Sequence, residues 1–291
     1  MTATTTRPAS SDSVADATAA PSRPPHRRRR SADPVPWWLI AIGVVVAGYF
    51  VLPTVIVIPM SFGGSSSFQF PPKEFSLALY ERFFTDPKWI GSLGNSLLVA
   101  VLAALIATVF GTAAAVGLNA LTGRLARAMR TLLMISMVTP AIVLAVAVYI
   151  SFLQWRITGT LGGYVLAHAT IGLPFVLVAV TSALGGFDRR LLRASASLGA
   201  TPLHTFLRVT MPLIGRGVVT GALFAFVTSL DEVVIALFLR SPTFQTLPVQ
   251  MYTAVTVEVD PTIAAASSLV VVSVTILLLI PQLVRRKTPR S

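Results

Sequence analysis

The sequence predicts an all-α integral membrane protein with six transmembrane helices. Apolar residues make up 54% of the 291 positions and charged residues only 12%, about half the charged share of a soluble domain. Unbroken apolar stretches of about 20 residues recur along the chain, and this is the length of a helix that crosses the hydrocarbon core. Because lipid offers the backbone no hydrogen-bond partner, only helices or closed barrels span a bilayer. The short alternating segments of a barrel are missing from this sequence.

The first 34 residues form a segment of their own. They are rich in Thr, Ala, Ser, Pro and Arg and end in four consecutive arginines at 27–30. Such a composition cannot bury enough apolar surface to offset the entropy of ordering, so we expect a disordered basic tail at 1–34 before a transmembrane domain at 35–291. The arginines favour a positive-inside topology signal, and contact with anionic headgroups is the alternative.

Six apolar stretches have the length of a span. They cover residues 37–60, 96–118, 131–153, 161–184, 217–239 and 263–283. The first is longer than the apolar region of a cleaved signal peptide. Pro140 and Pro174 are expected to kink their helices. Six spans place both termini on the same side of the membrane. The segments on that side contain 18 Lys and Arg residues and those on the other side contain 5, so the positive-inside rule predicts cytoplasmic termini.

The predicted outer segment 61–95 is aromatic and has balanced charge. Its rings allow two interpretations: a surface for an external partner, or an amphipathic segment lying at the membrane interface in one or two short helices. The aromatic residues are Phe75, Tyr80, Phe83, Phe84 and Trp89.

Several functional classes have no support in the residues. The net charge of +12 would indicate nucleic-acid binding in a soluble protein, but here the charge flanks the spans. The chain has no cysteine, and His168 has no second ligand at metal spacing, so we interpret it as a hydrogen-bonded packing residue and predict no metal site. No phosphate-binding loop or catalytic triad occurs. We therefore predict a transport subunit without cofactors, and any ATP hydrolysis comes from another chain.

The long inner loop, 185–216, has the pattern of two short helices joined at a sharp elbow. Asp188 and Thr201 are predicted helix caps, Pro202 suits a first helical turn, and Gly199 allows the left-handed conformation that ends a helix. Met211-Pro212 then marks the start of the fifth span. A short amphipathic helix of this kind fits a groove on a soluble partner or the membrane surface. Its flanking arginines are Arg189, Arg190 and Arg193.

The loop also has a distinctive spacing: Arg193-Ala194-Ser195, three residues, Gly199, nine residues, then Val209-Thr210-Met211-Pro212. This spacing resembles the EAA loop of ABC importer permeases, whose usual form is Glu-Ala-Ala-x3-Gly-x9-Ile-x-Leu-Pro. In that family the loop is a coupling helix that docks on the ATP-hydrolysing subunit. The chain departs from the pattern most at Arg193, where the family has Glu. The resemblance implies an ATPase-coupling role for Arg193, Ala194, Ser195, Gly199, Ala200, Val209, Met211 and Pro212.

Further stretches at 167–175, 229–234, 246–252 and 260–264 are similar to the spermidine/putrescine branch of these permeases. The resemblance implies a type I (MetI-like) core at about 93–285, with the first helix outside it. It implies assembly in the bacterial inner membrane with two ATPases, a periplasmic or lipid-anchored solute-binding protein and a second permease subunit, favouring a different one.

Two adjacent acids lie within the predicted fifth span, where an ionised carboxylate on a helix costs about 2.5–3.5 kcal/mol. They either pair with a neighbouring helix or line a cation path, and we favour the path for at least one. Adjacent helical residues point about 100° apart. Glu232 extends a small-residue stripe, Gly217-Gly221-Ala225-Ser229, that is predicted to pack against another helix, which puts Glu232 at a helix junction. Asp231 is predicted to face the substrate path. The predicted path residues are Asp231, Glu232, Ser229, Thr228, Thr220 and Phe224.

The resulting prediction is the permease subunit of an ABC importer for a small cation such as spermidine or putrescine. One alternative is an ABC permease for another solute, such as iron or an amino-acid derivative. Another is an ATP-independent transporter or channel that uses the same acids. Inverted repeats would favour this last alternative, and we find none.

Overall fold

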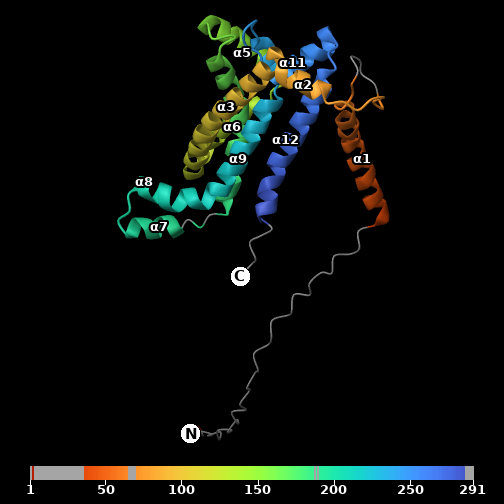
Figure 1. Cartoon of the computed structure of the whole chain (residues 1–291). Coiled ribbons are helices and arrows are strands. Elements are labelled where there is room, and N and C mark those ends of the chain that lie inside the picture. The colour runs from red at the N-terminus through yellow and green to blue at the C-terminus, as the bar shows by residue number, and fades with distance from the viewer. Residues whose placement is uncertain (1, 3–35, 65–69, 187, 189, 286–291) are drawn as a thin grey trace. The chain divides into compact units, whose positions relative to one another are not determined.

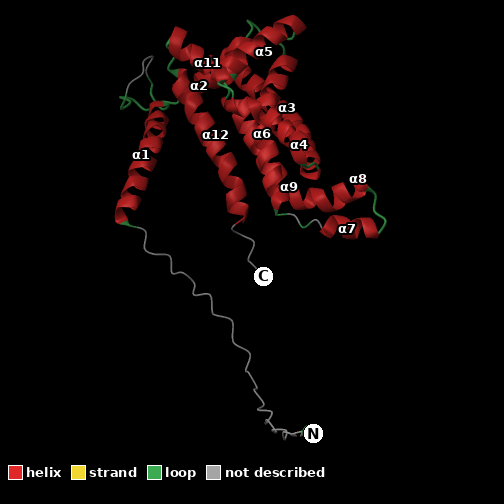
Figure 2. Cartoon of the chain, turned by 180° about the vertical axis from the view of Figure 1, so that it is seen from behind, coloured by secondary structure: helices red, strands yellow, loops and turns green. Residues whose placement is uncertain are grey.

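The structure is a computed structural model that describes residues 2, 36–64, 70–186, 188 and 190–285. Within these residues the secondary structure is helical (Figure 2), apart from one bridge between Gly63 and Phe75. The predicted tail, 1–34, lies outside the described residues except for Thr2. The chain divides within its first helix into residues 1–48 and 49–291. In the first part the described helical residues are all exposed; the rest of the description concerns the second part.

The helices are labelled in Figure 1. They are α1 (Trp37–Met60), α2 (Ala78–Thr85), α3 (Pro87–Ala120), α4 (Gly123–Val138), α5 (Ala141–Trp155), α6 (Leu161–Gly185), α7 (Arg190–Ser197), α8 (Pro202–Thr205), α9 (Met211–Asp231), α10 (Val234–Leu239), α11 (Leu247–Thr253) and α12 (Thr262–Arg285), with π-helical turns η1 (Phe206–Thr210) and η2 (Ala254–Glu258). Within the described residues, five helices are long and apolar enough to cross a membrane, or six if α4 and α5 form one bent span. This agrees with the predicted number.

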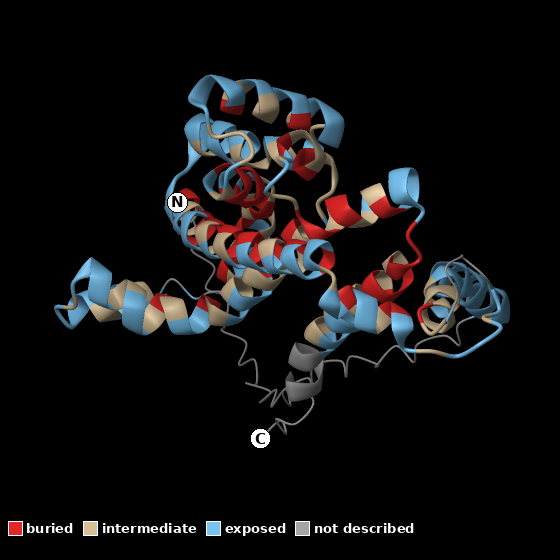
Figure 3. Cartoon of the chain, turned by 45° about the horizontal axis from the view of Figure 1, so that its top comes forward, coloured by how far each residue is buried: buried red, intermediate tan, exposed pale blue. Residues whose placement is uncertain are grey.

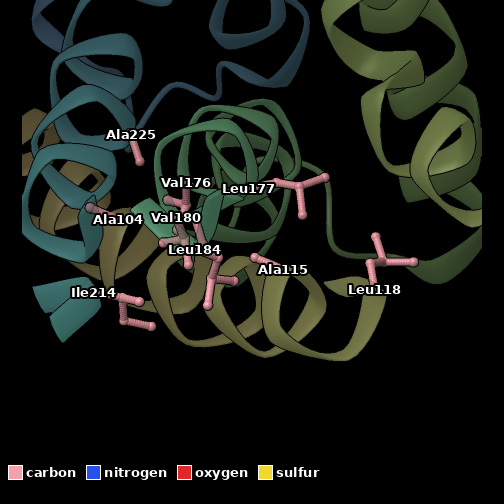
Figure 4. Close-up of a cluster of buried hydrophobic side chains, with 10 residues drawn as sticks. Ala104, Ala115, Leu118, Val176, Leu177, Val180, Leu184, Ile214 and Ala225 are labelled. Atoms are coloured by element: carbon pink, nitrogen blue, oxygen red, sulfur yellow. The ribbon is translucent and has the colours of Figure 1, made fainter. Parts of the chain in front are cut away.

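The core lies where α3, α6 and α9 pack together (Figure 4). Val176, Val180 and Ile214 are fully buried in it. Buried positions are concentrated where helices face one another (Figure 3). Glycines allow helices α6 and α9 to approach closely. A Cβ atom added at Gly221 would lie only 2.8 Å from the Cα of Val176, and one added at Gly217 only 2.6 Å from the Cβ of Ala183.

The stripe predicted on the fifth span therefore packs on α6. Gly221, Ala225 and Ser229 are buried, and an added Cβ at Gly172 of α6 would meet Ala225 at 3.1 Å. Small residues at four-residue spacing bring the two helix backbones together. The prediction that the small-residue stripe packs against another helix is confirmed for its residues up to Ser229, and it does not extend to Glu232.

The third span is not the continuous helix predicted over 131–153. Its two halves, α4 and α5, are bent by 104°. Thr139 has an extended backbone (φ −70°, ψ 132°), as expected for a residue that precedes a proline. Pro140 therefore ends the helix, whereas Pro174 lies inside α6, which continues through it.

The second span also begins earlier than predicted. Helix α3 starts at Pro87 rather than at Ser96, and the carboxylate of Asp86 caps it by accepting the N–H of Lys88 at 2.8 Å. Proline is well suited to the first turn, where its missing N–H leaves no bond unmade. One short helix, α2, precedes it. Phe83 and Trp89 are each 1% exposed, so these two rings pack inside the protein, while Phe75 and Phe84 are exposed.

Candidate functional site

The predicted fifth span is interrupted at the two acids. Helix α9 ends at Asp231, Glu232 is extended (φ −75°, ψ 111°), and α10 begins at Val234. The Glu232 carboxylate accepts the N–H of Ile235 at 2.8 Å and so caps the first turn of α10. A continuous helix over 217–239 was therefore a wrong prediction. Glu232 does lie at a helix junction, but the junction joins α9 to α10, and the stripe that packs on α6 ends before it.

A cavity of about 670 Å³ opens beside this break. Its wall comes from α2, α3, α11, η2 and α12 together with the end of α9, and it is mainly apolar. Aromatic rings from Phe83, Phe84 and Tyr252 line it, with hydroxyl groups from Ser96, Thr256 and Ser273 among others. Asp231 is the only ionisable acid or base, apart from the Tyr252 phenol, among the lining residues, all of which are described. A carboxylate in such surroundings attracts a cation, and the ring faces favour an alkylammonium group.

Of the predicted path residues, only Asp231 lines this cavity. Ser229 is buried against α6, Thr228 is half-buried, and Thr220 and Phe224 are exposed along α9. Helical periodicity grouped Thr220, Phe224 and Thr228 with Asp231, and all four do lie on one unbroken helix. The cavity, however, meets only the last two residues of that helix, and it is completed by residues far away in the sequence.

Sequence reasoning missed most of that wall. Tyr252 lies in a stretch singled out for its resemblance to polyamine permeases, but nothing in its spacing pointed to a shared cavity with Asp231. Thr256 and Ser273 carry no local signal, because their position depends on how η2 and α12 pack against α3 and α2.

His168 behaves as predicted. It is 1% exposed, and its Nδ1 shares a hydrogen bond of 2.8 Å with the Oγ of Ser229. One turn earlier on α6, the hydroxyl of Tyr164 donates to the carbonyl of Ala236 on α10 at 3.1 Å. Helix α6 is therefore bonded to both sides of the break. No cluster of three or more metal-ligating side chains occurs in the part of the chain that the structure describes.

Asp260, which does not itself line the cavity, holds together three of the elements that form its wall. Its carboxylate accepts hydrogen bonds from the backbone and hydroxyl of Thr262 at 3.0 and 2.7 Å and from the indole of Trp89 at 3.2 Å, and Arg82 lies 3.6 Å away. Burial raises the pKa of this carboxyl, but the bonds from Thr262 and Trp89 and the Arg82 charge outweigh it, so the pKa lies below its ordinary value. This cluster ties α2 and the start of α3 to the start of α12.

The loop at 185–216, predicted to be an inner loop, has the predicted arrangement of helix, elbow and helix. Asp188 accepts the N–H of Arg190 at 2.9 Å, and Thr201 accepts the N–H of His204 at 3.3 Å. Gly199 between α7 and α8 has φ +78°, a conformation that glycine adopts without strain. The hydroxyls of Ser195 and Thr205 share a hydrogen bond of 2.8 Å that joins the two arms. Arg189 lies outside the described residues.

Helix α9 begins at Met211 with Pro212 in its first turn, as predicted for the start of the fifth span, but the helical backbone itself begins earlier. The helix is continuous from Pro202 to Asp231 and passes through the π turn η1, in which the N–H of Met211 bonds to the carbonyl of Phe206. Pro212 has no N–H to donate, and the wider turn accommodates it. Helix α9 therefore connects the loop directly to Asp231, with α7 and α8 at the end of α9 opposite to α10 (Figure 1).

The remaining predicted coupling residues lie on this hairpin or where it joins the bundle. Arg193, Ala194, Gly199 and Pro212 are exposed, while Ser195, Ala200, Val209 and Met211 are half-buried. Leucines at the hairpin are uncovered: Leu198 is 88% exposed and Leu203 68%.

Membrane-length helices around a cavity, with a rigid hairpin at one end, define a membrane transport subunit. Residues 107–289 match the family described as binding-protein-dependent transport system inner membrane component, and the chain belongs to this family. It is therefore a multi-pass permease subunit of the inner-membrane part of an ABC importer.

Relatives and solved structures agree with this assignment. The spermidine/putrescine transport system permease protein PotC of Haemophilus influenzae is 33% identical over 243 residues, covering 84% of this chain and 94% of the relative. The putrescine transport system permease protein PotI of Escherichia coli is 31% identical, covering 80% of this chain and 85% of the relative. A crystal structure of a bacterial ABC transporter for the acidic polysaccharide alginate superposes with a TM-score of 0.65 at 16% identity, over 87% of this chain and 97% of that one, which supports the fold.

Proposed function

We propose that this permease subunit forms part of the path for a polyamine, with spermidine and putrescine as the expected substrates. The observation that carries the proposal is the single carboxylate, Asp231, in an otherwise uncharged cavity. The names of the relatives PotC and PotI point to the same substrates.

The chemistry of a polyamine matches this cavity. Such a molecule alternates ammonium groups with short methylene chains, so it needs both charge compensation and apolar contact. The Asp231 carboxylate, which is exposed in this subunit, pairs with one ammonium group through their opposite charges. The methylene chain packs on the apolar wall, and the rings of Phe84 and Tyr252 add cation–π contacts. One carboxylate neutralises one ammonium group, so the remaining charge is compensated by a second permease subunit or by water.

The proposed assembly contains this chain, a second permease subunit, two ATPase subunits and an external solute-binding protein. Both termini and the inner loop lie in the cytoplasm, where the exposed leucines of the hairpin meet the ATPase. The unbroken helix from Pro202 to Asp231 supports this arrangement, because it gives a movement of the loop a direct route to the carboxylate.

Uptake of labelled spermidine and putrescine into proteoliposomes that contain the assembled importer tests the proposal. Asp231→Asn keeps the shape of the side chain and removes its charge, and we expect uptake to fall at least tenfold, which corresponds to about 1.4 kcal/mol. Glu81→Gln is the matched control, since Glu81 is an exposed acid on α2 that does not line the cavity, and it should transport normally.

Two results contradict the proposal. Wild-type uptake by Asp231→Asn removes the assigned role of the carboxylate. Uptake that continues at the full rate without ATP indicates an ATP-independent transporter instead.

A further inference from the structure

The hairpin formed by residues 190–210 has a one-sided charge. It contains three arginines, at 190, 193 and 208, and no Asp or Glu. All three arginines are exposed. The ion pairs found among described residues join Arg82 to Asp260 and Lys88 to Glu258, so none of the three hairpin arginines forms an ion pair within the described part of this chain. Asp188, just before the hairpin, accepts the backbone N–H of Arg190, and three arginines against this one acid still leave the region positive.

The same hairpin carries uncovered apolar side chains beside these charges. Leu198 at the elbow, Leu203 on α8 and Leu207 on η1 are all exposed. A groove of about 480 Å³ between the arms is lined by Leu198, His204 and Arg208 among others. A partner for this surface must therefore supply apolar contact at the tip and negative charge around it.

The hairpin is also held in one shape. The bond between Ser195 and Thr205, the caps at Asp188 and Thr201, and the left-handed Gly199 each fix part of it. A preorganised surface loses little entropy on binding. This favours insertion of the tip into a complementary groove.

A membrane surface fits these features less well. A helix that lies on lipid buries a continuous apolar face, but most of α7 beyond its first turn consists of Ala and Ser. The largest apolar exposure is at the elbow, beyond the end of α7. If the tip of the hairpin inserts into a protein groove, Leu198 at the elbow is buried there, whereas a helix α7 that lies flat on lipid leaves Leu198 uncovered.

We propose that the ATPase groove that receives the hairpin has an apolar floor and an acidic rim, in which at least one carboxylate faces Arg193. The inference rests on the proposed function and specifies the chemistry of its partner. The EAA loops that this hairpin resembles carry Glu at this position, so a carboxylate that attracts Arg193 repels them, and the groove becomes selective for this permease.

The test measures binding of the purified, co-expressed ATPase subunit to the assembled permease in nanodiscs. Arg193→Glu is expected to weaken binding on the order of ten- to hundredfold, because close charge pairs at interfaces couple strongly, and Arg193→Ala should fall between it and wild type. Arg124→Glu makes the same charge change on an exposed residue of α4, and it should bind like wild type. Unchanged melting temperatures show that the variants are folded.

A rescue experiment identifies the partner groups. Single Asp or Glu residues of the ATPase groove are changed to Arg, and one of them should restore the binding of Arg193→Glu while weakening that of wild type. Wild-type affinity of Arg193→Glu, or the absence of any rescuing reversal, overturns the inference.

Varying the lipid composition of the nanodiscs distinguishes binding of Arg193 to lipid headgroups from its binding to the ATPase subunit. If Arg193→Glu weakens ATPase binding in discs containing phosphatidylglycerol but not in discs of phosphatidylcholine alone, the arginine acts through headgroups and the inference is wrong. If the wild-type permease binds no ATPase subunit in any disc, the proposed function itself fails, which is a different result from a normal affinity of the Arg193 variants.

Discussion

The Nδ1 atom of His168 on α6 lies 2.8 Å from the Oγ of Ser229 on α9, and both side chains are buried. This bond fixes α9 to its neighbour two residues before the helix ends at Asp231. The position of the cavity carboxylate therefore depends on a polar contact within the helix interface.

Ser229→Ala should destabilise the protein, because it leaves a buried ring nitrogen of His168 without its partner. We expect a loss of about 1–3 kcal/mol, seen as a lower melting temperature of the purified permease in detergent. Ser182→Ala, on an exposed position of α6, should melt like wild type. Equal melting temperatures for the two variants contradict the assigned role of the bond.

Gly221→Ala should force α6 and α9 apart. Its added Cβ would lie 2.8 Å from the backbone of Val176, and overpacking of a tight interface typically costs about 1–3 kcal/mol. Gly215→Ala is the matched control on the same helix, since an added Cβ there meets nothing within 4 Å. Thermal unfolding of both variants measures the difference, and a normal melting temperature for Gly221→Ala shows that the interface is looser than described.

The number of spans and the hairpin at 190–210 were predictable because they depend on local signals. Apolar length marks a span, and the caps at Asp188 and Thr201 with Gly199 between them mark a hairpin. The bend at Pro140 also had a local cause, since the residue before a proline avoids the helical conformation. The break after Asp231 had none, because no Gly or Pro stands there. The capping role of Glu232 is recognisable only once α10 is known to begin at Val234, since the N–H that its carboxylate accepts belongs to Ile235, three residues further along the chain.

The wild-type protein should lose stability in acid partly through Asp260, which lies outside the membrane-spanning helices. Its pKa is below the ordinary 3.8, so its contribution is fully present above that value and is lost as the pH falls through the lower folded-state pKa. Asp260→Asn removes this contribution, and its melting temperature should therefore change less than that of wild type between about pH 5 and pH 3. Glu81→Gln serves as the control for loss of an acid on α2. Parallel pH curves for wild type and Asp260→Asn argue against the carboxylate cluster.

Gly199→Val should weaken coupling between ATPase and permease. The residue has φ +78° and open space around it, so a side chain there meets no atoms but strains the backbone by roughly 1–2 kcal/mol. Gly199→Asn should be better tolerated, because asparagine adopts the left-handed conformation more readily. ATP hydrolysis stimulated by substrate-loaded binding protein is the measurement. Equal stimulation of both variants shows that the elbow conformation is unimportant.

The cavity was less predictable than the helices. Asp231 was singled out from its charge in an apolar stretch, and it does line the cavity. Its neighbours there, such as Tyr252 and Ser273, come from segments at other places in the chain and meet it only through tertiary packing. Thr220 and Phe224 were grouped with it by helical periodicity, which describes one helix and cannot identify a cavity whose wall several elements share.

The 30 residues from Pro202 to Asp231 form one rod, about 45 Å long at 1.5 Å per residue. A tilt of only about 5° at one end carries the other end sideways by roughly 4 Å over such a length, which is more than the span of a hydrogen bond. Because Gly217 and Gly221 pack closely against α6, we expect α6 to tilt together with this helix. The helix would then act as a lever, in which a small tilt at the hairpin displaces the Asp231 carboxylate by more than the length of a hydrogen bond.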